Sequence, residues 1–195
     1  MKKYKITFTG VSPLLMHSCR GANPLDPDVK YMKTITGKRT KTDEDHMLLI
    51  KLEYKLNSYF KDGIGFYIPA NILEQAIIGG SKKIKLGKKM PTAINIIDEY
   101  NKLEITAPHN LEQCSEMHEY MDVRYVVVNR AKIMRTRPRF DKWKVTFMLE
   151  LDDSIINDDQ LFESLNYAGS LVGICDYRPD KGGKYGRFEV GIEEI

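Results

Sequence analysis

Two histidines and a pair of aspartates are the side chains of this sequence best suited to chemistry. His17 follows the apolar residues 14–16, and His46 lies near the start of a predicted helix. A histidine can act as a general base near neutral pH, although a histidine beside an apolar run is often structural. Asp26 and Asp28 lie in a proline-containing segment, for which turn formation is the simpler explanation. His17, His46 and Asp26 are therefore candidate catalytic residues, each with a structural alternative.

The cysteine and histidine patterns predict neither a disulfide framework nor a metal site. Cys19, Cys114 and Cys175 are odd in number, widely spaced and outside any CxxC motif, which favours reduced thiols. The four histidines are spread along the chain and do not form pairs at the spacing of a zinc site. No P-loop, GxSxG or HExxH motif occurs. The sequence therefore predicts no metal and no cofactor.

Basic and acidic residues are separated along the chain, although the net charge is only +3. Between residues 124 and 144 there are eight basic residues and one acid, Asp141. The eight are Arg124, Arg130, Lys132, Arg135, Arg137, Arg139, Lys142 and Lys144. Residues 82–89 hold five lysines and no acid, whereas acids gather in residues 43–45 and 150–163. This separation favours a polyanionic partner, and an ordinary solvated surface is the alternative.

Hydrophobic periodicity predicts both strands and helices around these residues. The predicted strands span residues 5–11, 66–69, 92–97, 103–106, 123–128, 131–137, 143–151 and 188–192. The predicted helices begin at the caps Thr42, Asn71 and Asp158 or Asp159. The third and fourth strands should pair as a hairpin, and Gly79 with Gly80 should end the second helix. Residues 18–43 should form a long loop, and residues 135–140 a basic connection between strands.

The order of these elements predicts an α+β protein with a ferredoxin-like, RRM-like β-α-β-β-α-β core. Its first helix would be the one that begins at Thr42, and an inserted helix and hairpin block would follow at residues 62–122. A glycine-rich loop would precede the last strand. A length of 195 residues suits a single domain, residues 1–195. No window is apolar enough for a membrane span, so the expected partners exclude membranes and the expected location is the cytoplasm.

The last loop and one strand-to-helix junction resemble motifs of the RAMP proteins of CRISPR systems. The segment Lys181–Arg187 resembles the glycine-rich loop that marks these proteins, and Tyr67–Leu73 looks like the IPGSSLKG junction of their effector-backbone subunits. The whole chain is also similar to a group of uncharacterised bacteriophage and prophage proteins. The segments that carry this second likeness are Pro13–His17, Asn23–Pro27, Lys38–His46, Arg135–Pro138 and Asp176–Pro179.

The RAMP resemblance implies a ferredoxin-like core whose sheet and glycine-rich loop hold an RNA backbone, often in a helical assembly of subunits. Related RAMP enzymes process RNA without a metal through a general-base histidine, a role that the resemblance gives to His17 or His46. Certain backbone subunits instead keep a cleaving aspartate in the loop after the first strand, where Asp26 and Asp28 lie. The chain is short for a backbone subunit and has no clear thumb insertion.

Charge pattern and resemblance together predict a phage-type protein that binds single-stranded DNA or RNA, with homo-oligomers forming along the strand. The phage resemblance implies that its cytoplasmic location is in a bacterial host cell. The predicted contacts are Arg130, Lys132, Arg135, Arg137, Arg139, Lys142, Arg178, Gly182, Gly183, Lys184, Tyr185 and Arg187. The cations would neutralise phosphates, and the glycines would let backbone N–H groups approach them. Five nearby aromatic residues should either stack on bases or pack in the core. These are Tyr125, Phe140, Trp143, Tyr177 and Tyr185.

Two other functions stay open beside strand binding. One is an RNA endonuclease that uses His17 or His46 as its general base. The other is a protein-interaction module that blocks a host defence complex, with charges that mimic a natural subunit. Binding is favoured over catalysis, because the charge layout has a direct physical interpretation and no catalytic motif accompanies it.

Overall fold

A computed structural model describes residues 1–128 and 130–195 of the protein, and it describes only the backbone at residues 128 and 131. The described chain divides into two units. The segments of unit 1 are Met1–Leu14, Lys61–Thr106 and Phe140–Ile195, and those of unit 2 are Leu15–Phe60 and Ala107–Arg139. Unit 2 is therefore made of two separate stretches of the chain. Among the described residues, no helix has both the length and the apolar character needed to cross a membrane.

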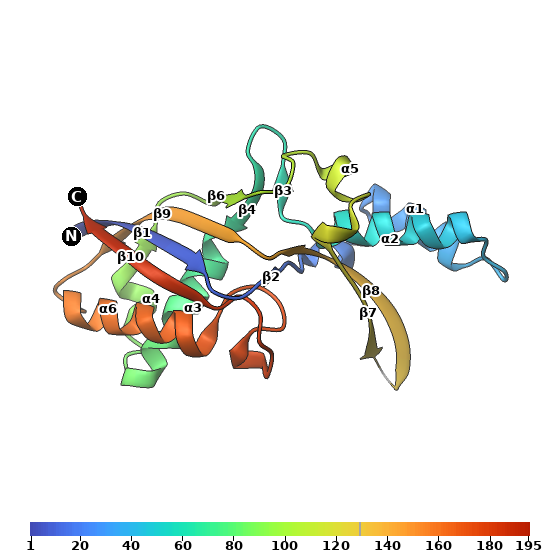
Figure 1. Cartoon of the computed structure of the whole chain (residues 1–195). Coiled ribbons are helices and arrows are strands. Elements are labelled where there is room, and N and C mark those ends of the chain that lie inside the picture. Colours follow the sequence, from blue (N-terminus) through green and yellow to red (C-terminus); the bar gives the residue numbers. More distant parts are fainter. Residues whose placement is uncertain (129) are drawn as a thin grey trace. The chain divides into compact units, whose positions relative to one another are not determined.

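Unit 1 is built on a seven-stranded sheet (Figure 1). Its strands are β1 (Lys2–Gly10), β3 (Phe60–Lys61), β4 (Gly65–Pro69), β5 (Ile94–Ile96), β6 (Tyr100–Ile105), β9 (Trp143–Leu151) and β10 (Phe188–Glu194). Their order is β10-β1-β9-β6-β4-β3, and β5 also pairs with β9. The hairpin predicted from residues 92–97 and 103–106 is wrong, because β5 and β6 each pair antiparallel with β9.

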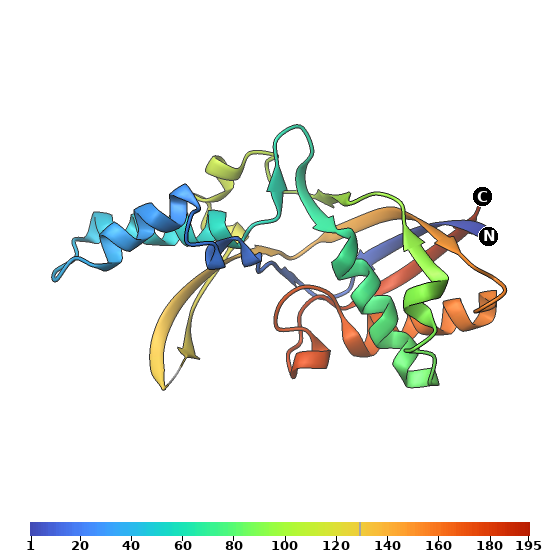
Figure 2. The ribbon, with the colours of Figure 1, turned by 180° about the vertical axis from the view of Figure 1, so that it is seen from behind.

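Helices cover one face of this sheet (Figures 1 and 2). They are α3 (Ala70–Ser81), α4 (Met90–Ala93) and α6 (Asp158–Tyr167), with the short helical turns η2 (Lys82–Ile84), η4 (Ala168–Val172) and η5 (Pro179–Lys181). Because side chains alternate along a strand, Tyr4, Ile6 and Phe8 of β1 all point to the same face, where they are buried. The Tyr4 hydroxyl donates to Asp158 of α6 at 2.6 Å, which ties this face to the helix. The prediction of a mixed α+β protein is confirmed.

The glycine pair of α3 lies inside the helix and does not end it. An added Cβ at Gly80 would lie 2.0 Å from the Ser164 carbonyl oxygen and 2.6 Å from the Ala168 nitrogen. An added Cβ at Gly79 would lie 2.8 Å from a methyl group of Val172. Only glycine allows backbones to approach so closely, so this pair serves the packing of α3 against α6 and η4.

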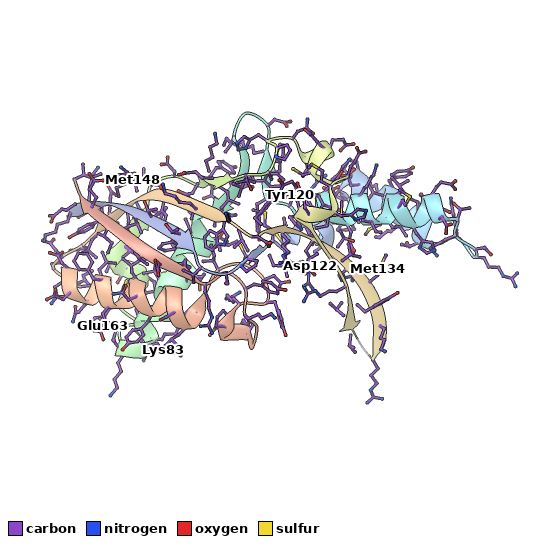
Figure 3. The ribbon with its side chains drawn as sticks, in the orientation of Figure 1. Lys83, Tyr120, Asp122, Met134, Met148 and Glu163 are labelled. Atoms are coloured by element: carbon purple, nitrogen blue, oxygen red, sulfur yellow. The ribbon has the colours of Figure 1, made fainter. Side chains whose placement is uncertain are left out.

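The opposite face of the sheet carries polar side chains in cross-strand pairs. Figure 3 shows Met148 of β9 on this face, whereas Lys83 and Glu163 lie on the helical side. On the open face Lys5 pairs with Glu193 at 3.2 Å, and Lys144 pairs with Glu104 at 3.5 Å. Lys144 belongs to the predicted basic stretch, so one of its eight charges faces a carboxylate across the sheet.

Unit 2 combines helices with a three-stranded sheet in the order β2-β8-β7. Its elements are η1 (Cys19–Ala22), α1 (Pro27–Thr36), α2 (Asp43–Asn57), α5 (Leu111–Cys114), η3 (His118–Tyr120) and β7 (Met121–Val128), with β2 (Leu14–Leu15) and β8 (Ala131–Phe140) at its borders. β7 and β8 form a long antiparallel hairpin, in which Met121 faces Pro138 (Figure 1). Figure 3 labels Asp122 near the start of this hairpin and Met134 farther along it.

The predicted N-cap of α2 is confirmed, but the prediction that α2 is the first helix of the core around the large sheet is wrong. Thr42 and Asp45 form a capping box, in which each side chain accepts a hydrogen bond of 3.2 Å from the other's N–H. The helix belongs to unit 2, whereas α3 and α6 cover the large sheet of unit 1. Periodicity identifies a helix correctly, but it contains no information on which sheet the helix meets.

Two further predictions in unit 2 are corrected by the structure. Residues 18–43 are not one long loop, because they contain η1 and α1. Residues 135–140 are not a connection between strands, because β8 continues through Pro138 to Phe140. Proline lacks an N–H donor, but its carbonyl still accepts, and the Pro138 carbonyl receives the N–H of Met16 at 2.9 Å.

Candidate functional site

The glycine-rich loop of unit 1 runs from Gly173 to Arg187, between η4 and β10. The N–H of Ile174 donates to the Gly186 carbonyl at 2.9 Å, and the N–H of Gly186 donates to the Pro13 carbonyl at 2.8 Å. The Arg187 carbonyl in turn accepts the N–H of Val11 at 2.9 Å. These backbone bonds tie the loop to the segment that follows β1 and hold it in one shape.

The glycines of this loop shape it and do not offer spare N–H groups. The N–H of Gly182 donates to the Pro179 carbonyl, and that of Gly183 donates to the Arg178 carbonyl, both at 2.9 Å. An added Cβ at Gly183 would lie 1.7 Å from the Tyr177 carbonyl oxygen. This corrects the expectation that Gly182 and Gly183 present backbone donors to a phosphate, because those donors are already used within the loop.

Two of the five aromatic residues near the predicted cations are exposed. Phe140, Trp143 and Tyr185 are buried in the core, so the prediction of Tyr185 as a contact is corrected. Tyr177 of the glycine-rich loop is 44% exposed, and Tyr125 of β7 is 73% exposed. Only these two of the five have ring surface available to a partner.

Tyr177 is held in an uncommon backbone conformation. Its φ is 47° and that of Cys175 is 61°, the left-handed region that side chains other than glycine rarely adopt. The Tyr177 ring lies 5.9 Å from the buried Tyr185 ring, centroid to centroid. Strained positions persist where the surroundings enforce them, and they concentrate at functional sites.

The Cys175 thiol takes no part in chemistry at this loop. Burial raises its pKa to about 12, which keeps the thiol protonated and inert near neutral pH.

The predicted cations of the loop play different parts. Arg178 donates through Nη1 to the Cys175 carbonyl at 2.9 Å and lies 3.8 Å from Asp180, so it supports the loop. Lys184 and Arg187 are exposed. Lys181 is exposed as well and lies 3.7 Å from Asp180. The loop therefore presents one exposed tyrosine and three exposed cations on a backbone that is fixed by internal hydrogen bonds.

The β7–β8 hairpin of unit 2 presents a similar combination. Arg130, which adopts a φ of 66° in the turn, and Lys132 are both exposed. Tyr125 faces Met134 across the strands, and Val127 faces Lys132. Because these four strand residues alternate with their neighbours, they lie on one face of the hairpin, where an aromatic ring and a cation stand side by side.

The arginines of the hairpin that lie farther from its turn, Arg124 and Arg135, form ion pairs within unit 2. Arg135 Nη1 donates to Glu53 Oε1 at 2.5 Å, and the other oxygen of Glu53 accepts the N–H of Thr136 at 2.7 Å. Arg124 pairs with both carboxylate oxygens of Asp122. The remaining predicted cations are Arg137 and Arg139, half-buried in β8, and Lys142, exposed before β9. The prediction that Arg135 is open to a phosphate is thus corrected, because a carboxylate from α2 already holds it.

His17 and Arg135 come together in a cavity of about 290 Å³ in unit 2. Residues from four parts of the unit line it, among them His17, Cys19, Met32, Glu53, Leu56 and Arg135. Sequence reasoning selected His17 and Arg135 for separate reasons and missed Glu53, whose helical position gives no sign of its partner on β8. The general-base role of His17 stays a prediction.

The other two catalytic candidates lie outside this cavity lining. Asp26 caps α1 by accepting the N–H of Asp28 at 2.9 Å, and it accepts Arg20 Nε at 2.7 Å. Burial alone would raise the pKa of the Asp26 carboxyl, but the hydrogen bonds from Arg20 and the Asp28 N–H outweigh it and hold this pKa below its ordinary value. His46 is exposed in the first turn of α2. Asp26 therefore has a structural role that accounts for its position.

Comparison with models of known protein families gives no match to the chain, and comparison with curated proteins gives none either. Within the described part of the chain, no three histidine, cysteine, aspartate or glutamate side chains gather as a metal ion would require. The two tyrosine-and-cation surfaces and the cavity are therefore the candidate binding surfaces of the described residues.

Proposed function

We propose that the protein binds a single strand of nucleic acid through both its phosphates and its bases. The observation that carries this proposal is the pairing of an exposed tyrosine with exposed cations in each unit. In unit 1 these are Tyr177, Lys184 and Arg187, and in unit 2 they are Tyr125 and Lys132. The other three aromatic residues near the predicted cations, Phe140, Trp143 and Tyr185, are buried.

Both the cations and the exposed aromatic rings can bind nucleic acid. Lysine and arginine neutralise phosphates and release counterions, which provides affinity without sequence preference. A base that stacks on an exposed aromatic ring adds about 1–3 kcal/mol. The faces of the bases are accessible to an aromatic ring in a single strand but are stacked on one another in a duplex. The combination of cations and rings therefore favours a single strand.

The fold of unit 1 supports the same proposal. The order β10-β1-β9-β6, with α3 and α6 on one face, is compatible with a ferredoxin-like core made of two β-α-β halves. In a RAMP-like protein the glycine-rich loop before the last strand would lie against the nucleic-acid backbone. Here that loop carries Tyr177, Lys184 and Arg187, and internal hydrogen bonds fix its shape.

The test is fluorescence anisotropy with labelled single-stranded DNA, single-stranded RNA and duplex over a series of salt concentrations. Affinity for a single strand should fall steeply with salt, and duplex should bind more weakly. The double variant Lys184→Ala/Arg187→Ala should lower the slope of log K against log salt by about 1.4, since each phosphate contact to a single strand contributes roughly 0.7. Tyr177→Ala should weaken binding by about 1–3 kcal/mol and leave the slope unchanged.

The matched control for the charge change is Lys88→Ala/Lys89→Ala. These two lysines are also exposed and also belong to unit 1, but they lie in the segment before α4 instead of the glycine-rich loop. The control should bind like the wild type. Equal losses in the two double variants would reduce the effect to net charge, and binding that is absent or insensitive to salt would reject the proposal.

A further inference from the structure

The cavity of unit 2 has walls that are tied together before any ligand arrives. The N–H of Ser18 donates to the Asn57 carbonyl at 3.0 Å, and the Tyr59 hydroxyl donates to the His17 carbonyl at 3.0 Å. The Asn57 amide, at the end of α2, donates to the Thr136 carbonyl of β8 at 2.9 Å. The segment after β2, the end of α2 and β8 are thus linked by hydrogen bonds, so the cavity is preformed.

Glu53 fixes the Arg135 guanidinium in the cavity wall and offsets its positive charge. Glu53 accepts from Arg135 with one oxygen and from the Thr136 N–H with the other. The carboxylate holds the guanidinium in place and offsets its charge, so the pair does not attract an anion as a lone arginine would. The guanidinium has five N–H donors and a planar face, which leaves it able to hydrogen bond or stack with a neutral ligand.

The rest of the lining combines apolar and polar surface. Met32 and Leu56 supply apolar side chains, whereas His17 and Cys19 add an imidazole and a thiol. A site of this kind suits a ligand that is mainly apolar and carries a few hydrogen-bonding groups. A volume of about 290 Å³ is at the lower end for small-molecule sites, which fits one flat ring system with hydrogen-bonding edges.

We propose that this cavity receives one unstacked nucleobase. Proteins that recognise single strands hold splayed bases against aromatic rings, imidazoles or guanidinium planes and hydrogen bond their edges. His17 and Arg135 offer such surfaces here, and Met32 and Leu56 add apolar lining. The inference rests on the proposed function, because it names the part of the bound strand that enters unit 2.

Cys19 provides a direct measurement of occupancy. It lines the cavity and is exposed, whereas Cys114 and Cys175 are buried. N-ethylmaleimide should therefore label Cys19 first in the native protein, and mass spectrometry can follow that single adduct. Adenosine, guanosine, cytidine and uridine are the probes, with ribose 5-phosphate and inorganic phosphate as probes without a base. At least one nucleoside should slow the labelling of Cys19 several-fold in a saturable manner, and the two probes without a base should not.

Two variants locate the effect in the cavity. Gly21→Leu places a side chain there, at a position where an added Cβ has its nearest neighbour, Leu56 Cβ, at 3.9 Å. Arg135→Lys keeps the charge opposite Glu53 but removes the planar group. Each should lose the protection by nucleoside, whereas Lys30→Gln, an exposed position on the same helix as Met32 but outside the cavity lining, should keep it. Protection that survives both Gly21→Leu and Arg135→Lys would overturn the proposal.

Strand binding by anisotropy and Cys19 labelling, measured on the same protein, distinguish this inference from the function on which it rests. If the intact strand binds by anisotropy but neither strand nor nucleoside slows the labelling of Cys19, strand binding stands and the base cavity is rejected. If nucleosides protect Cys19 although no strand binds, the cavity stands and strand binding is rejected. Protection by ribose 5-phosphate equal to that by nucleosides would show recognition of the sugar phosphate and would also reject the base cavity.

Discussion

Asp26 illustrates how one carboxylate can support several local contacts at once. It caps α1, and together with Asp28 it holds the Arg20 guanidinium, with Arg20 Nη2 2.6 Å from Asp28 Oδ2. Pro27 follows at the first helical position, where its missing N–H costs nothing. The sequence Asp-Pro-Asp is thus a helix start, and a carboxylate used in this way is occupied before any substrate arrives.

Asp26→Asn should destabilise the protein at neutral pH by about 1 kcal/mol, because the ion pair with partly exposed Arg20 is lost while asparagine preserves the cap. The pKa of Asp26 is lowered in the folded state, so its contribution is complete above the unfolded value of 3.8 and disappears as pH falls through the lowered folded value. Chemical unfolding from pH 7 downward measures this. A difference between wild type and variant that stays constant below pH 3.8 would contradict the assignment.

Among the elements, α3 shows how a residue that is unfavourable for a helix can stabilise a fold. Glycine lowers helix propensity by about 1 kcal/mol relative to alanine. The approach of α6 leaves no room for a methyl group at Gly80, since backbone atoms of Ser164 and Ala168 occupy that space. The requirement for contact between two helices therefore outweighs the local preference of one.

Gly80→Ala should destabilise the protein by about 1–3 kcal/mol in spite of its better helix propensity, because backbone atoms of α6 must move. The matched control is Gly191→Ala in β10, where an added Cβ would have Thr7 Cβ as its nearest neighbour at 3.7 Å. That variant should be neutral or slightly stabilising, since glycine weakens a strand interior by roughly 0.5–1 kcal/mol relative to alanine. Thermal unfolding of both variants gives the comparison, and equal effects would refute the packing explanation.

At the scale of the whole molecule, stability should differ between the large sheet and the hairpin. β1 pairs with β9 on one side and β10 on the other, and its core-facing side chains are buried. β7 lies at the edge of its sheet beside β8 and carries the exposed side chains Val123, Tyr125 and Val127. Local opening requires little energy where few apolar contacts are lost.

Hydrogen exchange followed by mass spectrometry should therefore find amides of β1 protected for orders of magnitude longer than those of β7. Both measurements come from one sample, so β1 serves as the internal reference. Equal protection of the two strands would mean that β7 is covered by a partner or packed more firmly than its exposed side chains indicate.

Local features of this protein could be predicted from the sequence because they depend on near neighbours. The capping box of Thr42 and Asp45 joins residues three apart, and the alternation along β9 follows from strand geometry alone. The separation of charge along residues 124–144 is likewise a property of the sequence. These features were sufficient to predict helices, strands and a mixed α+β fold.

Tertiary structure alone decided which side chains remain available to a partner. Arg135 meets Glu53 from 82 positions away, Tyr185 is buried while Tyr177 is exposed, and Gly80 is required by α6. Periodicity identifies which face of an element is apolar, but it does not identify the element that covers it. Ion pairing, ring burial and close helix contact all depend on distant residues, so the availability of each candidate site residue became known only from the fold.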